Sequence, residues 1–184
     1  MAIHRSNATL LPTLRTGNMD NPFPSGLTGS WASLAVEAER GCFAMRRFRF
    51  DEDRWSVVYR AWADAPMSAP LFTLRAAGHY LLGGPSRFVP GAIEGIFPAL
   101  RRTITAESAA GVALFSGMGR TLLAGQETSL AVDACGFIPS LMTAMGEYDL
   151  VCLRDGRLFF GDRTGDLTTA RPTALTPFPL VPSA

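Results

Sequence analysis

The sequence predicts a mainly β protein, an antiparallel barrel with one short packed helix. Three observations favour this fold class. Short segments alternate apolar and polar residues, as half-buried strands do. The 13 prolines and 18 glycines are spread along the chain and separate these segments, which is typical of a turn-rich protein. One stretch near the middle has apolar residues at helical spacing and predicts the helix.

The chain has 184 residues, 47% of them hydrophobic, which is enough for one domain with a real core. We expect residues 1–26 to be an irregular N-terminal arm, because three prolines and a Gly17-Asn18 pair interrupt any regular pattern. Residues 27–184 then form the β-barrel domain.

The first half of this domain predicts an antiparallel meander. Phe48-Arg49-Phe50 alternates strongly, and Asp51-Glu52-Asp53 supplies a polar turn to the next strand. The predicted strands cover residues 31–39, 43–50, 55–62, 71–82 (a pair or one long bent strand), 91–97 and 101–105, the last two separated by Pro98.

The second half predicts a helix over Ala106–Gly117, with Thr105 as its N-cap and Gly119 as its end. Strands at 121–124 and 129–134 follow. Asp155-Gly156 suits a tight hairpin turn between strands 148–153 and 157–161. The proline-rich end, 171–184, is expected to run extended over the surface. These elements add up to a barrel of roughly eight to ten strands.

The charge pattern excludes several classes of protein. There are 17 basic and 16 acidic residues, for a formal net charge of +1, and the basic residues occur singly or in pairs. Because phosphate binding needs clustered positive charge, we expect no nucleic-acid partner. Every basic residue is arginine, so no lysine can form a Schiff base or act as a general base. No Walker motif or dinucleotide fingerprint is present, and we expect no cofactor.

The cysteines and the apolar runs bear on the compartment. Cys42, Cys135 and Cys152 are odd in number and lack CxxC spacing, which favours reduced, mostly buried thiols and no metal site. No apolar run has the length of a signal peptide or of a membrane span. We therefore expect a cytoplasmic protein without a membrane span, and leave open whether it forms a homodimer.

Several short motifs occur in a defined order between residues 29 and 181. They are Gly29-Ser30-Trp31, Glu37, Gly41, Arg46, Arg49-Phe50, Ala69-Pro70-Leu71-Phe72-Thr73-Leu74, Leu158-Phe159-Phe160-Gly161-Asp162 and Arg171-Pro172-Thr173. Together they resemble the domain of the "adenomatosis polyposis coli down-regulated" family, known best from extracellular Wnt antagonists.

This resemblance implies a lipocalin-like β-barrel of the calycin type, with a hydrophobic pocket that accepts a lipid chain. The extracellular members have a cysteine just before the first-strand glutamate, where this chain has Val36. Their partner cysteine, near Pro66 and Met67, is missing as well. The absence of this disulfide fits a reducing compartment, and a role in Wnt signalling does not carry over.

Strand parity places Trp31 and Glu37 on the same face of the first strand. If Trp31 points inward to plug one end of the barrel, Glu37 points inward too, and a buried carboxylate must be paired or protonated. Arg47 or Arg49 on the neighbouring strand could pair with it in a structural ion pair. Alternatively, Glu37 is a polar anchor or a general acid/base in the cavity, with a pKa raised by burial.

His79 lies beside Tyr80 on a predicted strand, and an imidazole titrates near neutral pH. A lone histidine is more often structural, but Glu37, His79 and Tyr80 are the candidate catalytic residues. Further large or polar side chains are expected to bind the ligand or line the cavity; they are Trp31, Arg47, Arg49, Trp55, Tyr59 and Phe72.

Two functions follow from this interpretation. In the first, the protein binds a hydrophobic small molecule, lipid or polyketide-like, through burial of apolar surface inside the barrel. In the second, the protein is a cofactor-independent cyclase or isomerase of specialised metabolism, whose barrel folds a flexible substrate into a reactive shape.

Overall fold

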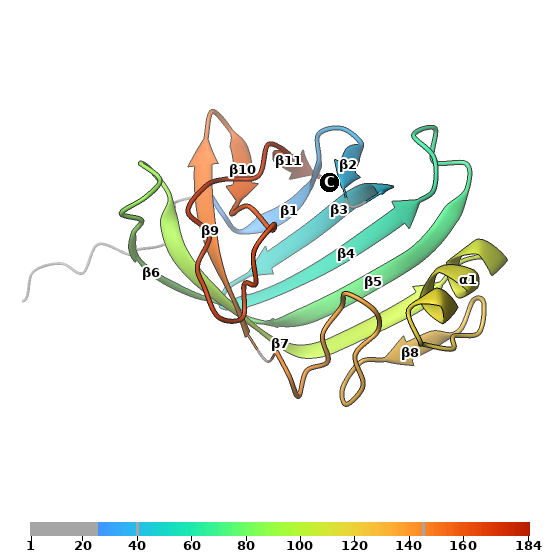
Figure 1. The fold of residues 1–184 in the computed structure, drawn as a ribbon. Coiled ribbons are helices and arrows are strands. Elements are labelled where there is room, and N and C mark those ends of the chain that lie inside the picture. The colour runs from blue at the N-terminus through green and yellow to red at the C-terminus, as the bar shows by residue number, and fades with distance from the viewer. Residues whose placement is uncertain (1–25, 40, 145) are drawn as a thin grey trace, which may run out of the picture.

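The computed structural model describes residues 26–39, 41–144 and 146–184. They form one large antiparallel sheet with one short helix, so the predicted fold class is confirmed (Figure 1). Residues 1–25 of the predicted N-terminal arm lie outside the described residues. No helix among the described residues is long and apolar enough to cross a bilayer.

Eight of the strands belong to a ring. They are β1 (Gly29–Ser33), β3 (Cys42–Asp51), β4 (Arg54–Trp62), β5 (Pro70–His79), β7 (Ile93–Ala106), β9 (Gly146–Arg154), β10 (Arg157–Phe160) and β11 (Leu180–Ser183). Three shorter strands extend this ring at its edges: β2 (Glu37–Glu39) pairs with β3, while β6 (Leu81–Pro85) and β8 (Glu127–Ser129) pair with β7. The helix is α1 (Ala109–Gly117).

The ring closes through antiparallel pairs only. In the described chain its order is β1-β11-β10-β9-β7-β5-β4-β3, and β3 pairs back to β1, with Trp31 opposite Phe48. From β3 to β11 the ring strands follow one another in chain order, and β1 fills the last place. This up-and-down arrangement is the one found in eight-stranded lipocalins.

Aromatic side chains fill one end of the ring. This aromatic floor consists of six buried residues, Phe48, Phe50, Trp55, Tyr80, Phe97 and Phe160. Phe48 stacks on Phe160 at 4.7 Å between ring centroids, and Phe50 meets Tyr80 edge-on at 5.3 Å. The Tyr80 hydroxyl donates to the carbonyl of Glu52, so its polar atom is satisfied. The floor is therefore a close-packed core.

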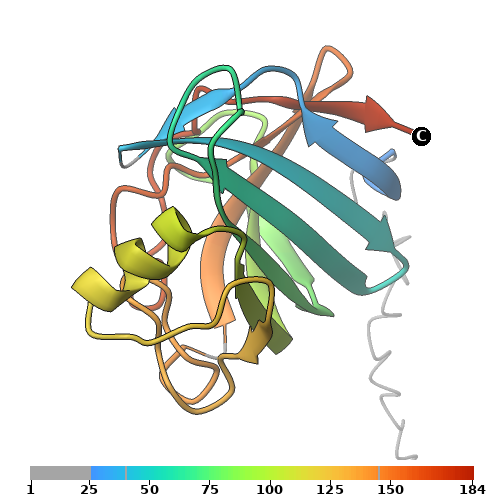
Figure 2. The same cartoon turned by 90° about the vertical axis from the view of Figure 1, so that its right-hand side faces the viewer.

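The helix and the segment after it cover the other end (Figure 2). The apolar cap is formed by Phe72, Ile104, Phe115, Leu122, Leu130 and Ile138. Ser108 caps α1 by accepting a hydrogen bond from the Gly111 N–H. Gly111 is required here, because a Cβ atom would lie 1.9 Å from the carbonyl oxygen of Leu71. This close approach seats the helix on β5.

Two predicted boundaries around β7 are wrong. β7 runs without a break through Pro98. At this residue the register with β5 shifts and the pairing with β9 ends. The N–H that proline lacks would therefore have no partner in the sheet, and no hydrogen bond is lost. The helix begins after Ser108 and not after Thr105, because Thr105 is still paired with Thr73 in the sheet.

Other local predictions also differ from the structure. Residues 121–124 make only an isolated bridge, Ala106 to Ala124, and the strand expected at 129–134 is found at Glu127–Ser129. Residues 71–82 divide into β5 and β6, which both pair with β7. The proline-rich end does more than cover the surface, because Leu180–Ser183 forms β11 and completes the ring.

Candidate functional site

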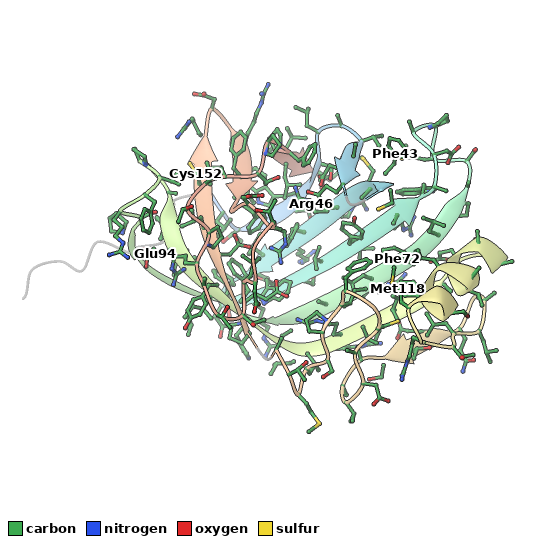
Figure 3. The ribbon with its side chains drawn as sticks, in the orientation of Figure 1. Phe43, Arg46, Phe72, Glu94, Met118 and Cys152 are labelled. Carbon is green, nitrogen blue, oxygen red and sulfur yellow. The ribbon has the colours of Figure 1, made fainter. Side chains whose placement is uncertain are left out.

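Charged side chains lie on the inner wall of the ring, beyond the aromatic floor. This polar belt consists of Glu37, Arg46, Arg102, Glu147, Asp149 and Arg163, and Figure 3 shows Arg46 among the side chains gathered inside the ring. A charge inside a protein is costly unless an opposite charge or hydrogen bonds compensate it. The belt satisfies this condition in two groups, one on each side of the ring.

The first group joins β1, β2 and β3. The Arg46 Nε lies 2.9 Å from Glu37 Oε2 and donates to Oε1 at 3.0 Å. The Ser33 hydroxyl donates to the same carboxylate at 2.6 Å, and Arg46 also donates to the Phe178 carbonyl at 3.0 Å. Only 1% of the Glu37 side chain and 7% of that of Arg46 are exposed. Burial raises the pKa of Glu37, and Arg46 and Ser33 only partly oppose this rise.

The second group joins β7, β9 and the loop after β10. Arg163 donates to Asp149 Oδ2 at 2.8 Å and also pairs with Glu147. Asp149 Oδ1 accepts from the Gly161 N–H at 2.7 Å, and Arg102 lies 3.5 Å from Glu147. Burial raises the pKa of Asp149 although Arg163 lowers it. Burial alone would lower the pKa of Arg163, but the charges of Asp149 and Glu147 outweigh it and raise that pKa.

Tyr59 and Cys42 lie beside the first group. The Tyr59 hydroxyl is 3.8 Å from the Cys42 Sγ, and the Tyr59 ring stacks on Phe72 at 5.9 Å. Burial raises the pKa of Tyr59, and so does the charge of nearby Cys42, Glu39 and Glu37. The hydroxyl is therefore neutral and can donate or accept a hydrogen bond.

Solvent reaches this part of the inner wall. Arg163 exposes 36% of its side chain and Glu147 23%, although both belong to the ion-paired group. Cys42, Tyr59 and Leu74, whose side chains also face inward, are only half-buried. The residues of the floor and those of the cap, by contrast, are buried. The inward-facing side chains that solvent reaches therefore lie between these two apolar regions.

The inward-facing charges of the described residues do not cancel when all are ionised. The carboxylates of Glu37, Glu39, Glu147 and Asp149 stand against the guanidinium groups of Arg46, Arg102 and Arg163, four negative charges to three positive. Glu39 takes part because it follows Glu37 by two residues on β2 and therefore faces the same way. Among these described side chains one negative charge is in excess.

The structure corrects the predicted partner of Glu37. Arg47 and Arg49 are exposed and alternate with buried Arg46, Phe48 and Phe50, so they point away from the interior. Arg46 pairs with Glu37 instead. Of the remaining predicted ligand-binding residues, Trp31 and Trp55 are packed in the core around the floor, whereas Phe72 and half-buried Tyr59 lie next to the accessible wall.

The structure does not bring the three candidate catalytic residues together. Glu37 lies opposite Ala44 at one end of β3, whereas His79 lies in line with Asp51 at its other end, seven residues or about 23 Å away. His79 is paired with Asp53 at 2.9 Å outside the ring. Tyr80 belongs to the floor, with its hydroxyl bound to a backbone carbonyl.

Of the polar belt, only Glu37 is identified from the sequence, although the strand parity of two other residues indicates that they face inward. Arg46 shares its parity with Phe48 and Phe50, which marks it as inward-facing. Asp149 likewise shares its parity with buried Val151. The ion pair from Arg163 to these acids has no such signal, because Arg163 lies in a loop whose path depends on the whole barrel.

Cys42, Cys135 and Cys152 are free thiols, and the last two are buried. Within the described ranges no group of three His, Cys, Asp or Glu side chains could hold a metal ion. No known family model matches the chain, and no curated protein matches it significantly in sequence.

Proposed function

We propose that the protein binds a hydrophobic small molecule inside the barrel, with the polar end of that molecule at the polar belt. One observation carries this proposal. Two inward-facing side chains of the belt, Arg163 and Glu147, are partly exposed, whereas the floor and the cap on either side are buried. A barrel whose only task was to fold would fill this region with its own apolar side chains, as it does at the floor.

The wall around the accessible region suggests the chemistry of the ligand. Leu74 and the Tyr59 ring offer apolar surface, and the Tyr59 hydroxyl offers a hydrogen bond. Each arginine of the belt already has a carboxylate partner, and one negative charge is in excess. These features favour a lipid- or polyketide-like molecule whose polar group is a hydroxyl, a carbonyl or an amine.

The family resemblance supports the same function. Two of its motif residues, Glu37 and Arg46, form the buried ion pair. Trp31, from another motif, packs in the core cluster that contains Phe48. The two late motifs also meet, because Gly161 leaves room for Pro172, whose Cγ would lie 2.4 Å from an added Cβ. The expectation from the resemblance is a pocket that accepts a lipid chain.

The alternative, a cyclase or isomerase, has less support. The candidate catalytic residues of such an enzyme, Glu37, His79 and Tyr80, lie apart in the structure. Glu37 is the one inward-facing acid of the three candidates, and its carboxylate is held by Arg46 and Ser33. A general acid/base must reach the proton that it transfers, and this carboxylate is almost wholly covered.

The proposal is tested by filling the accessible region. Leu74→Trp places a large ring on the inner face of β5, and Val58→Trp places the same ring on the outer face of neighbouring β4. N-phenylnaphthylamine, a neutral apolar dye, is the probe, and its fluorescence reports binding. We expect Leu74→Trp to weaken dye binding by about ten-fold or more, because the added ring occupies space that the dye needs, and Val58→Trp to leave it unchanged.

Native mass spectrometry of the protein as purified gives an independent measurement, in which a bound amphiphile is expected. Absence of both a bound molecule and saturable dye binding by the folded wild type would contradict the proposal. Equal loss of dye binding in Leu74→Trp and Val58→Trp, with both variants folded, would also contradict it.

A further inference from the structure

The outer face of the sheet carries a second concentration of charge, separate from the polar belt. Strands β3, β4, β5 and β7 run side by side, and Figure 1 shows them as the broadest continuous part of the ring. Six arginines point outward from these strands. This arginine face consists of Arg47, Arg49, Arg54, Arg60, Arg75 and Arg101.

The pairing register arranges these arginines in two dimensions. Arg47 lies in line with Val58 and Arg75 across three strands, and Arg49 lies in line with Ser56, Ala77 and Arg101 across four. Neighbouring strands are about 5 Å apart, and alternate residues on one strand are about 7 Å apart. The charges are therefore spread over an area, and do not follow a single groove.

Fewer carboxylates than arginines lie on or beside this face. Asp51, Glu107 and Glu127 lie on or beside the same face, and two more acids lie in the turn at its edge, exposed Glu52 and Asp53, which is paired with His79; these are five acids against six arginines. Glu127 contacts Arg101 at 2.5 Å and Arg75 at 3.9 Å. Within the described ranges, no carboxylate lies at ion-pair distance from Arg47, Arg54 or Arg60. The face therefore has an excess of positive charge that the fold does not use.

Two further features of this face favour an anionic ligand with an apolar part. A hollow of about 180 Å³ lies between Arg75 and Arg101, where Ser56, Val58 and Ala77 supply small side chains. At the far end of the face, beyond Met45 and Arg60 in the register, Phe43 and Trp62 are cross-strand neighbours and are half-buried. Aromatic residues at the rim of a basic surface are typical of proteins that contact the interface of a bilayer.

We propose that the arginine face binds anionic phospholipid headgroups at a membrane surface. Arginine recognises phosphate oxygens through its planar fork of donors, and each basic residue near an anionic surface strengthens binding about five-fold. A single-stranded nucleic acid would need aromatic platforms within the charged area, and the described strands hold aromatic side chains only at its end. Duplex binding would need an element shaped to enter a groove, which a convex sheet face does not provide.

Vesicles of phosphatidylcholine with phosphatidylglycerol, compared with vesicles of phosphatidylcholine alone, test the proposal by co-sedimentation. We expect the wild type to bind only the anionic vesicles and to dissociate at high salt. The triple variant Arg47→Gln, Arg49→Gln, Arg60→Gln should bind these vesicles at least ten-fold more weakly, because it loses three charges. Glu127→Gln should bind them about five-fold more tightly, because it removes an opposing carboxylate from the face.

A matched variant separates this face from net charge alone. Arg87→Gln, Arg154→Gln, Arg157→Gln also removes three exposed arginines, but from the opposite side of the barrel. It should bind anionic vesicles nearly as the wild type does. The proposal is overturned if the folded wild type shows no preference for anionic vesicles, or if the two triple variants lose binding equally. It is also overturned if the arginine face binds single-stranded DNA more tightly than the vesicles.

Discussion

The aromatic floor and the polar belt occupy neighbouring parts of the same barrel interior, and they are built on opposite principles. The floor buries six aromatic side chains and no ionisable group other than the Tyr80 hydroxyl. The belt has three arginines among its six residues, and burial raises the pKa of both Glu37 and Asp149. Apolar packing stabilises a fold directly, whereas a buried ion pair often contributes no more to stability than apolar residues of the same size would.

Under the proposed function, this difference separates the residues that stabilise the fold from those that contact the ligand. The floor is the part of the barrel that the protein needs in order to fold. The ion pairs of the belt stabilise the fold little, because the cost of burying their charges offsets their attraction. We therefore infer that these charges serve to bind the polar end of the proposed ligand. Substitutions in the two regions should therefore have different effects on stability and on ligand binding.

The largest effect is expected at the floor. Phe50→Ala removes a fully buried ring that contacts Phe48, Tyr80, Phe97 and Phe160, and should lower the free energy of unfolding by about 4 kcal/mol. Chemical denaturation measures this change. Phe88→Ala is the control, because Phe88 is about half exposed, and it should cost less than about 1 kcal/mol. Equal losses in the two variants would contradict the assignment of the floor as the main core.

A somewhat smaller effect is expected when one partner of the buried pair is removed. Arg46→Met leaves Glu37 without its counter-charge and should cost about 3 kcal/mol of unfolding free energy. The double variant Arg46→Met, Glu37→Gln should recover a substantial part of that loss, because no uncompensated charge remains. If the double variant is as unstable as the sum of the two single variants, the pair itself stabilises the fold and the contrast with the floor is wrong.

The sequence predicts the floor better than the belt, for a physical reason. Strand alternation reports which side chains are apolar and inward, and it identifies strands around Phe48, Trp55 and Phe72 correctly. The belt depends on charged residues that break this pattern. Strand parity predicts that Glu37 faces inward, and the same parity applied to β3 places Arg46 inward as well. The partners Glu147 and Arg163 meet only because β9 and the loop after β10 are brought together by the closed ring.

The arginine face shows the same limit of sequence reasoning. Its arginines occur singly or in pairs along the chain, which led us to expect no cluster of positive charge. Alternate residues on four adjacent strands nevertheless fall on one side of the sheet, and the register collects six of them there. Clusters that depend on cross-strand pairing are hidden in a linear charge pattern.

The pH dependence of stability sharpens the comparison further. Burial raises the pKa of Glu37 above its ordinary value of 4.5, so the folded state binds more protons than the unfolded state between the two values. The contribution of Glu37 to stability therefore falls as the pH rises through this interval. Relative to Glu37→Gln, the wild type should lose unfolding free energy from about pH 4.5 upward, as measured by denaturation at a series of pH values. A relative gain by the wild type would show that Arg46 outweighs burial.

The smallest effect on stability, and the most informative about function, is expected at Tyr59. Among the described residues its hydroxyl contacts only the weak partner Cys42, at 3.8 Å, so Tyr59→Phe should change the unfolding free energy by less than about 1 kcal/mol. Loss of a hydrogen bond to the ligand should nevertheless weaken binding by about five- to ten-fold. The molecule found bound to the purified protein is the titrant for this measurement.

Tyr148→Phe provides the matched control for this substitution. Tyr148 lies on the outer face of β9, where Arg171 stacks over its ring, so removing its hydroxyl should leave ligand binding unchanged. If both variants bind as the wild type does, the polar end of the ligand does not lie at Tyr59. The belt would then have to be explained by folding alone, although buried ion pairs are often no better for stability than apolar residues of the same size.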